Sequence, residues 1–319
     1  MKPVKISPVI RVISDNDYAG DPDGLIQLAH QLLSPGTELR AVIGSHLRAD
    51  DHWNRTGDSV GDAIKGIKKI IALTDPTTSA KVLRGHDGPM KDVNTPADSE
   101  GARFIIEEAH RTDTNLPLYV VCGGSLTTIA SAWLLDPTIA EKLIVVWIGG
   151  AEHPGHTPPP PGAPKIEYNM YEDLFSAQVI FNKSDLNIWQ IPRDAYRQCL
   201  ATLSELKVRM KSAGELGEFL YDSLGEAIDL AVQHSGRYGE IYMMGDSALV
   251  LVTSLQNSFE PSPSSCEFIE IPRPAINDEG AYEVQTNAPT IRVFTRMDSR
   301  LMLEDLYAKL AIHASQSTR

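Results

Sequence analysis

Short runs of apolar, β-branched residues alternate along this chain with longer segments of helical periodicity. The apolar runs that predict strands lie at residues 9–14, 39–44, 118–122 and 143–148. The segments that predict helices lie at residues 24–34, 60–73, 100–111, 126–134 and 174–181. Strands that alternate with helices form βαβ units, whose strands run parallel. The alternation therefore predicts an α/β fold with an open, mostly parallel sheet flanked by helices.

The length of 319 residues permits one domain or two. Segment 153–164 is too rich in proline and glycine to form a helix or a central strand, so it is a loop or an interdomain linker. Strand and helix patterns resume after it, at 187–191, 291–295 and 300–313. We therefore expect a single domain over residues 1–319, with segment 153–164 as a loop at the edge of the sheet.

Charge, cysteine usage and hydropathy restrict the partners and the cellular compartment of the protein. The net charge of −13, with no Lys/Arg cluster, argues against a nucleic acid polymer as partner. An acidic balance suits carboxylates around a divalent cation, although acidity also serves solubility alone. Three cysteines without a short C-x-x-C spacing indicate a reducing compartment. No signal-peptide core or membrane-spanning run is found, so the cytoplasm is expected, without a membrane partner.

The segment that is most informative about function is DNDYAGDPDG, at residues 15–24, directly after the first predicted strand. Its four carboxylates repel one another unless a cation or solvent separates them. A strand-to-helix connection puts them at the carboxyl end of a parallel sheet, where open α/β folds bind ligands. Helix capping and turn formation are the alternative explanation, and they account for one or two aspartates more readily than for all four. We therefore expect a hard-cation site with oxygen ligands.

Five segments carry motifs in order along the chain. They are the aspartate loop with the LIQLAHQLLSP that follows it, VVCGGSLT at 120–127, IGGA at 148–151, IEYNMYED at 166–173 and GDSA at 245–248. They resemble, in the same order, the D-x-D-P-G-x-D-D-A loop, the G-G/P-L-T-N turn, the M-G-G-A strand end, and the A-E-F-N-x-x-x-D and H-D-P-L-A segments of the inosine-uridine type nucleoside hydrolases. Because the five segments span nearly the whole chain, the chain is identified as a member of this family.

The resemblance implies a Rossmann-like nucleoside hydrolase fold with the active site at the carboxyl ends of the strands. It implies hydrolysis of the N-glycosidic bond of a ribonucleoside or a close relative, in purine or pyrimidine salvage. In the family a calcium ion (Ca²⁺) lies at the floor of the pocket and binds two ribose hydroxyls and a water. Relatives are commonly dimers or tetramers, so we expect a homo-oligomer with a small-molecule substrate.

The same resemblance implies roles for individual residues. The metal ligands are Asp17, Asp21, Asp23, Asp246 and the backbone carbonyl of Cys122. Asp17 would also act as general base on the bound water. The residues near the substrate are Asp15, Asn54, His156, Glu167 and Asn169, of which the last two match the pair that grips the ribose.

Two positions depart from the family pattern. Counting back from Pro35 places Gly24 where the family has the second aspartate of an adjacent pair, so Asp21 must supply a ligand from the enlarged loop. Gly245 stands where the family has a histidine that assists the departing base. Leaving-group activation then needs another group or is unnecessary, and His46, His52, His156 and His234 are candidates by residue type, while Trp53 and Tyr168 could stack on a base.

These departures keep two other functions open. A catalytically weak, calcium-dependent sugar-binding protein would retain the aspartates and lack leaving-group chemistry. A hydrolase of a non-nucleoside glycoside would use the same metal ligands, but the part of its pocket that receives the leaving group would differ.

Overall fold

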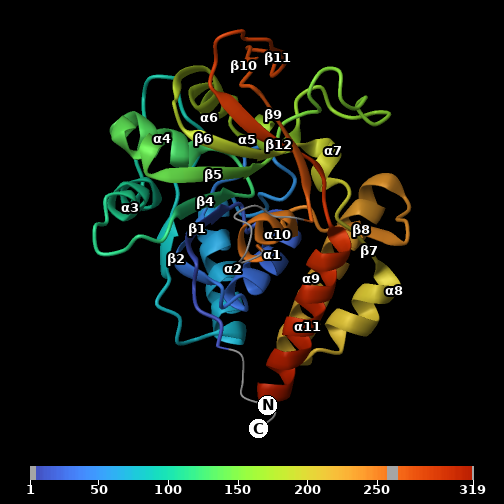
Figure 1. Cartoon of the computed structure of the whole chain (residues 1–319). Coiled ribbons are helices and arrows are strands. Elements are labelled where there is room, and N and C mark those ends of the chain that lie inside the picture. The colour runs from blue at the N-terminus through green and yellow to red at the C-terminus, as the bar shows by residue number, and fades with distance from the viewer. Residues whose placement is uncertain (1–4, 257–264, 318–319) are drawn as a thin grey trace.

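An eight-stranded sheet forms the centre of the molecule (Figure 1). The computed structural model describes residues 5–256 and 265–317. The strand order is β3-β2-β1-β4-β5-β6-β12-β9. The strands are β1 (Ile10–Asn16), β2 (Thr37–Gly44), β3 (Lys81–Arg84), β4 (Leu118–Cys122), β5 (Leu143–Ile148), β6 (Asn187–Ile191), β9 (Glu267–Pro272) and β12 (Thr290–Arg296). Neighbouring strands are parallel except β9, which pairs antiparallel with β12. The predicted open, mostly parallel sheet is confirmed.

Helices cover both faces of this sheet (Figure 1). The core on one face includes residues of α1 (Asp23–Leu32), α2 (Ser59–Thr74), α9 (Gly214–Ser235), α10 (Ser247–Ser254) and α11 (Ser299–Ser317). The core on the other face includes residues of α3 (Glu100–Ala109), α4 (Thr127–Leu135) and α6 (Leu174–Gln178). Because successive side chains of a strand point to opposite faces, β4 contributes Val121 to the first core and Val120 to the second.

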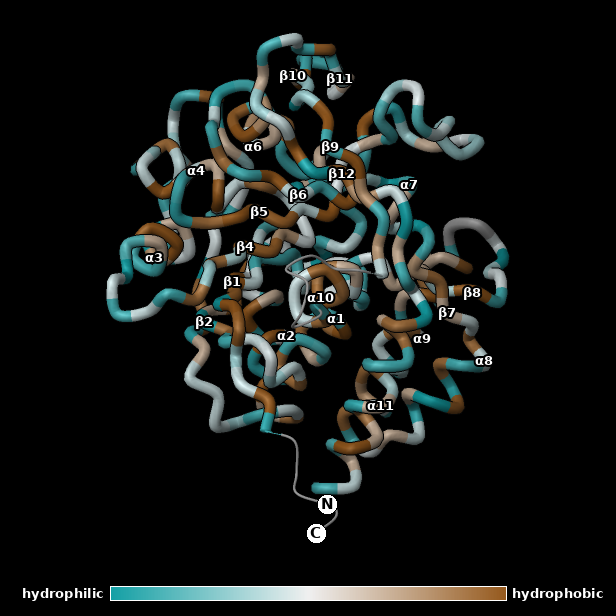
Figure 2. Tube along the Cα trace, viewed as in Figure 1, coloured by the Kyte–Doolittle hydropathy of each residue, from teal (hydrophilic) through white to brown (hydrophobic). Residues whose placement is uncertain are grey.

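Burial on both faces explains the composition of the central strands. Figure 2 shows apolar residues concentrated along β1 and β5. A strand with two buried faces reads as a continuous apolar run rather than an alternating one. This is why β4 and β5 stand out in the sequence as LYVVC and LIVVWI.

Shorter elements connect the main ones. They are η1 (Pro137–Glu141), α5 (Tyr168–Glu172), η2 (Val179–Lys183), α7 (Arg193–Tyr196), β7 (Leu200–Thr202), α8 (Leu203–Leu206), η3 (Lys207–Lys211), β8 (Ile241–Met243), β10 (Ala275–Ile276) and β11 (Tyr282–Glu283). Strands β7 and β8 pair antiparallel, as do β10 and β11. Within the two described ranges, no helix combines the length and the apolar composition that a membrane span requires.

The carboxyl ends of β1, β2, β4 and β5 meet at one edge of the sheet. Asn16 is level with Gly44, Asp15 with Cys122, and Cys122 with Trp147. The loops that leave this edge are residues 17–22, 45–58, 123–126 and 149–167. The last of them contains segment 153–164, which is a loop as predicted and follows the central strand β5. The motif segments of the sequence therefore converge at this edge.

Candidate functional site

A cavity of about 300 Å³ opens at the carboxyl edge of the sheet. Its residues come from the loop after β1, the start of α1, the loop after β2, the ends of β4 and β5, the start of α5, α7, β8 and the segment between β8 and α10. The lining consists of Asp17, Asp21, Asp23, His52, Trp53, Gly123, Ile148, Glu167, Tyr168, Asn169, Tyr196, Met243, Gly245 and Asp246. The cavity thus combines an acidic part, a polar wall and an aromatic side.

The acidic part is formed by aspartates that are far apart in the chain, at positions 17–23 and 246. Asp17, Asp23 and Asp246 are each less than a tenth exposed. The backbone N–H of Asp246 donates to Oδ2 of Asp23 at 3.0 Å. Asp21, in the same loop, accepts a hydrogen bond from the hydroxyl of Tyr242 in β8. The fold therefore gathers all four predicted carboxylates around one cavity.

Burial is the main cause of unusual ionisation in this cluster. It raises the pKa of Asp17 and of Asp23 well above the usual range, and the carboxylate of Asp246 raises both further by repulsion. Burial also raises the pKa of Asp246 to about 7, with the Asn16 amide acting in the opposite direction. Three desolvated carboxylates that repel one another are stable in their ionised form only beside a positive charge.

The donor set fits a hard divalent cation in its chemistry. Carboxylate oxygens are the ligands that Ca²⁺ prefers, and no thiolate lines the cavity. In the described part of the chain, however, no three His, Cys, Asp or Glu side chains already converge as a ready-made metal site. Cys122 is fully buried in β4, and its neighbour Gly123 reaches the cavity lining. Of the predicted ligands, the carboxylates that line the cavity and would hold the ion are Asp17, Asp21, Asp23 and Asp246.

The polar wall consists of Glu167 and Asn169, at the start of α5. The Glu167 carboxylate accepts from the backbone N–H of Gly150 at 2.7 Å and from the hydroxyl of Tyr196 at 2.9 Å. The Asn169 amide donates to the carbonyls of Gly123 at 2.9 Å and Ile148 at 2.8 Å. Both side chains are thereby fixed to the ends of the central strands. Glu167 is 1% exposed, and burial raises its pKa.

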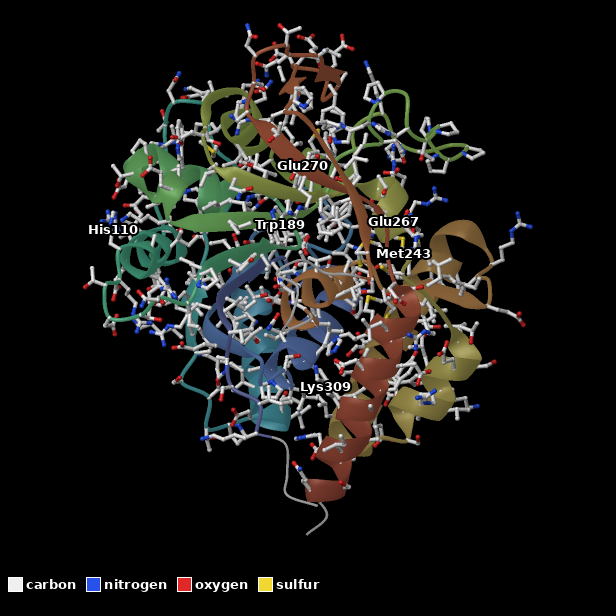
Figure 3. The ribbon with its side chains drawn as sticks, viewed as in Figure 1. His110, Trp189, Met243, Glu267, Glu270 and Lys309 are labelled. Atoms are coloured by element: carbon white, nitrogen blue, oxygen red, sulfur yellow. The ribbon has the colours of Figure 1, made fainter. Side chains whose placement is uncertain are left out.

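The aromatic side of the cavity contains Trp53, Tyr168 and Tyr196. The Tyr168 hydroxyl donates to Oδ2 of Asp51 at 2.9 Å, which holds its ring against the loop after β2. Met243 of β8, labelled in Figure 3, also lines the cavity. Aromatic faces with one polar tip suit a flat, partly apolar group.

Gly245 widens the cavity between the acidic part and the aromatic side. A Cβ atom at this position would lie 3.4 Å from Oδ2 of Asp23, 3.4 Å from Cδ1 of Ile148 and 3.6 Å from the ring of Tyr196. These are ordinary contact distances. A larger side chain here would extend from that point into space that the glycine leaves to the cavity.

The structure places three predicted substrate residues outside the cavity lining. Asp15 is 1% exposed behind the end of β1, where it accepts a hydrogen bond from Ser45, and burial raises its pKa to about 6. The Asn54 amide donates to the carbonyl of Arg48 at 3.0 Å, which stabilises the loop after β2. His156 is exposed in the loop after β5.

The histidines considered as acids differ in whether they line the cavity. His46 is 1% exposed and contacts Oγ1 of Thr127 at 3.0 Å, and burial lowers its pKa to about 4. His52 lines the cavity, with its side chain 48% exposed, and lies 5.2 Å from Trp53 between ring centres. The side chain of His234 lies outside the described residues. His52 is therefore the histidine among these that reaches the cavity.

Sequence reasoning did not single out Asn16, Tyr196 or Met243. Asn16 is fully buried and donates to Asp246, yet the D-x-D pattern treats its position as variable. Tyr196 and Met243 lie in α7 and β8, short elements without a motif. Only the fold brings them to the cavity.

Comparison with known proteins identifies similar chains. A family model described as inosine-uridine preferring nucleoside hydrolase matches residues 12–303. Among solved structures, a plant nucleoside hydrolase, PpNRh1, is similar with a TM-score of 0.72 and 18% identity, over 95% of this chain and 99% of that one. A purine-preferring ribonucleoside hydrolase from Gardnerella vaginalis gives 0.70 and 19%, over 96% and 99%. An inosine-uridine preferring nucleoside hydrolase from Bacillus anthracis gives 0.68 and 15%, over 95% and 99%. No curated protein matches in sequence.

Proposed function

Since the chain belongs to the inosine-uridine preferring nucleoside hydrolase family, we propose that it hydrolyses the N-glycosidic bond of ribonucleosides, or of a close N-riboside, in a calcium-dependent reaction. Members of this family are N-glycosyl hydrolases, so the chain is an enzyme of that type. The observation that carries the proposal is the meeting of Asp17, Asp23 and Asp246 with Glu167 and Asn169 in one cavity.

Each part of the cavity then has a chemical task. Ca²⁺, when bound, supplies the positive charge that keeps the buried aspartates ionised and makes water more acidic. Asp17 accepts the proton of the attacking water as general base. Glu167 and Asn169 orient the ribose through side chains that the strand ends already fix, so little ordering is needed when substrate binds.

The aromatic side receives the leaving group. Trp53, Tyr196 and Met243 offer flat or flexible apolar surface, which supports a planar heterocyclic base as the leaving group. Because Gly245 carries no acid, His52 is the group that could protonate the base as it departs. The aromatic surface alone would suffice for a base that leaves without a proton.

The test is a reducing-sugar assay over purine and pyrimidine ribonucleosides, 2′-deoxynucleosides and simple glycosides. Each is measured after treatment with EDTA and again after adding CaCl2. We expect ribonucleoside hydrolysis that EDTA abolishes and CaCl2 restores. Activity on simple glycosides alone would contradict the proposed substrate. Activity that EDTA leaves unchanged would contradict the proposed dependence on calcium. Binding of ribose without turnover would favour the sugar-binding alternative.

We also propose a single catalytic domain over residues 1–319 and a cytoplasmic homo-oligomer, either a dimer or a tetramer. The sheet takes strands from both ends of the chain, which supports one domain. Cys122, Cys199 and Cys266 are buried free thiols, in keeping with a reducing compartment. Light scattering coupled to size-exclusion chromatography tests the oligomeric state, and cell fractionation tests the compartment.

A further inference from the structure

The side chain of Asn16 connects the backbone of Asp17 to the carboxylate of Asp246. It is the last residue of β1 and is fully buried. Its Oδ1 accepts from the backbone N–H of Asp17 at 2.8 Å, and its Nδ2 donates to Oδ2 of Asp246 at 2.8 Å. Because Oδ1 faces a donor, Nδ2 must face the acceptor, so the orientation of the amide is determined by its neighbours.

Two glycines leave room for this amide. A Cβ atom at Gly123 would overlap the side chain of Asn16. A Cβ atom at Gly24 would lie 3.2 Å from Nδ2 of Asn16 and 3.2 Å from Oδ2 of Asp246, tighter than most side-chain contacts. Glycine at positions 24 and 123 therefore leaves the space that the side chain of Asn16 fills. The three residues form one packing unit around Asp246.

The Asp246 carboxylate bonds to Asn16 and not to helix α10. Asp246 precedes α10 with helical backbone angles, φ −64° and ψ −26°, and its side chain makes no capping bond. The backbone N–H groups of Ala248 and Leu249 bond to the carbonyls of Gly245 and Asp246. The Asp246 carboxylate accepts from Asn16, while its backbone N–H donates to Asp23. Asn16 is therefore the residue that orients this carboxylate.

We infer that Asn16 is a positioning residue, whose amide holds the Asp246 carboxylate toward the cavity and fixes its geometry relative to Asp17. The inference rests on the proposed function, because it makes Asp246 a working ligand. A neutral donor suits this place, since it binds a carboxylate without adding a further negative charge to a cluster that already repels itself. Replacing the hydrogen-bond partner of a metal ligand commonly lowers metal affinity or activity by about 10- to 100-fold.

The experiment uses Asn16→Leu, which keeps the branching and the number of heavy atoms of the side chain and removes the donor, and Asn16→Ala as a second variant in case the first folds poorly. Calcium affinity is measured by calorimetry with CaCl2 alone on chelator-treated protein. We expect a Kd about 10- to 100-fold weaker than that of the wild type, and a similar fall in kcat.

The matched control is Gln31→Leu. Gln31 is 1% exposed in α1, and its amide donates to the hydroxyls of Thr37 and Ser254, away from the cavity. Both amide-to-leucine changes should lower the melting temperature. Only the change at Asn16 should also weaken calcium binding and turnover per folded molecule. Equal Kd and kcat in the wild type and both Asn16 variants would overturn the inference.

A crystal structure of Asn16→Leu gives a readout that needs neither calcium nor activity. Released from the amide, the Asp246 carboxylate should rotate away from its wild-type orientation, because leucine offers it no donor. This rotation supports the positioning role even if the wild type neither binds calcium nor hydrolyses nucleosides, a result that would refute only the proposed function. An Asp246 carboxylate that keeps its orientation refutes the positioning role.

Discussion

Asp17 is the residue on which the proposed chemistry depends most. Burial raises its pKa, and the carboxylates of Asp246, Glu172, Asp51 and Asp21 raise it further. A carboxylate in such surroundings accepts a proton readily once a cation keeps it ionised.

Asp17→Asn should therefore keep the fold and lose nearly all hydrolysis, since the amide keeps an oxygen for the metal and lacks the basic site. The expected fall in kcat is about 10² to 10⁴. Steady-state kinetics and thermal unfolding measure the two effects. Asp113→Asn, at an exposed carboxylate paired with Arg111, is the control and should change neither. If the Asp17→Asn variant kept most of its activity, the general base would be another aspartate.

His52 gives the second prediction at this scale. If His52 protonates the departing base, kcat of the His52→Ala variant on inosine or uridine should fall about 10²-fold. The variant should keep its activity on nitrophenyl riboside, because nitrophenolate leaves without a proton. The wild type should cleave the nitrophenyl compound far faster than either nucleoside. The exposed His156, changed to alanine, serves as control. Equal losses on both substrate types would point to a contact with the ribose instead.

At the scale of elements, the loop after β2 determines what the aromatic side can bind. Arg48 ties this loop to α5 through Oε1 of Glu172 at 2.7 Å, contacts Asp51 at 3.2 Å and lies over the ring of Tyr171 at 4.0 Å. Asp51 in turn accepts from Tyr168. One guanidinium thus connects the loop that carries His52 and Trp53 to the helix behind Glu167.

Arg48→Met should loosen this loop while leaving the aspartates in place. We expect KM for nucleosides to rise by about tenfold, with a smaller change in kcat, because the loop positions the base rather than the water. Hydrogen exchange over residues 45–58 should increase. Arg103→Met, which removes an exposed ion pair with Asp98, is the control. A fall in kcat without a change in KM or in exchange would contradict this view of the loop.

The parallel part of the sheet could be predicted from the sequence because buried strands are continuous apolar runs. Strands β1, β2, β4, β5 and β6 lie where those runs predict them. Strand β9 could not be recognised, because it is a short edge strand, EFIEIP, whose two glutamates interrupt the apolar run. Helix α9 contains Gly214, Gly217 and Gly225, which weaken its helical propensity, and it is stabilised by packing of Leu216, Leu220 and Leu224 in the core.

The candidate site shows the same division between pattern and packing. Asp17 and Asp23 lie in the connection that leaves β1, so their place at the carboxyl edge follows from a parallel sheet. Glu167, Asn169 and Asp246 are also carried by motifs, but packing rather than a strand end brings them to the same cavity. The loop residues Asn54 and His156 have no such constraint, because loop spacing does not determine side-chain direction. Tyr196 and Met243 depend on tertiary packing alone.

For the whole molecule, the buried aspartates predict that stability depends on pH and calcium together. Asp15 has a pKa of about 6 and Asp246 of about 7 in the folded state, against 3.8 as the ordinary value. Between about pH 4 and pH 7 the folded state therefore binds more protons than the unfolded state, and the free energy of unfolding falls as the pH rises.

Thermal unfolding in EDTA should accordingly give a melting temperature several degrees lower at pH 7.5 than at pH 5. Adding CaCl2 should reverse the loss at pH 7.5, because a ligand of the folded state stabilises it. Asp246→Asn should flatten the pH dependence in EDTA. A melting temperature in EDTA that rises across this range would contradict the buried, metal-dependent aspartate cluster.

The hydrogen bond from Asn16 to Asp246 joins residues 230 positions apart in the chain. During synthesis at roughly 5 to 20 residues per second, on the order of ten to fifty seconds separate the appearance of these two partners. Strand β12, which closes the parallel sheet beside β6, appears later still. The Asp246 partner of the Asn16 amide is therefore available only after most of the chain has been synthesised, and the parallel sheet is completed later still.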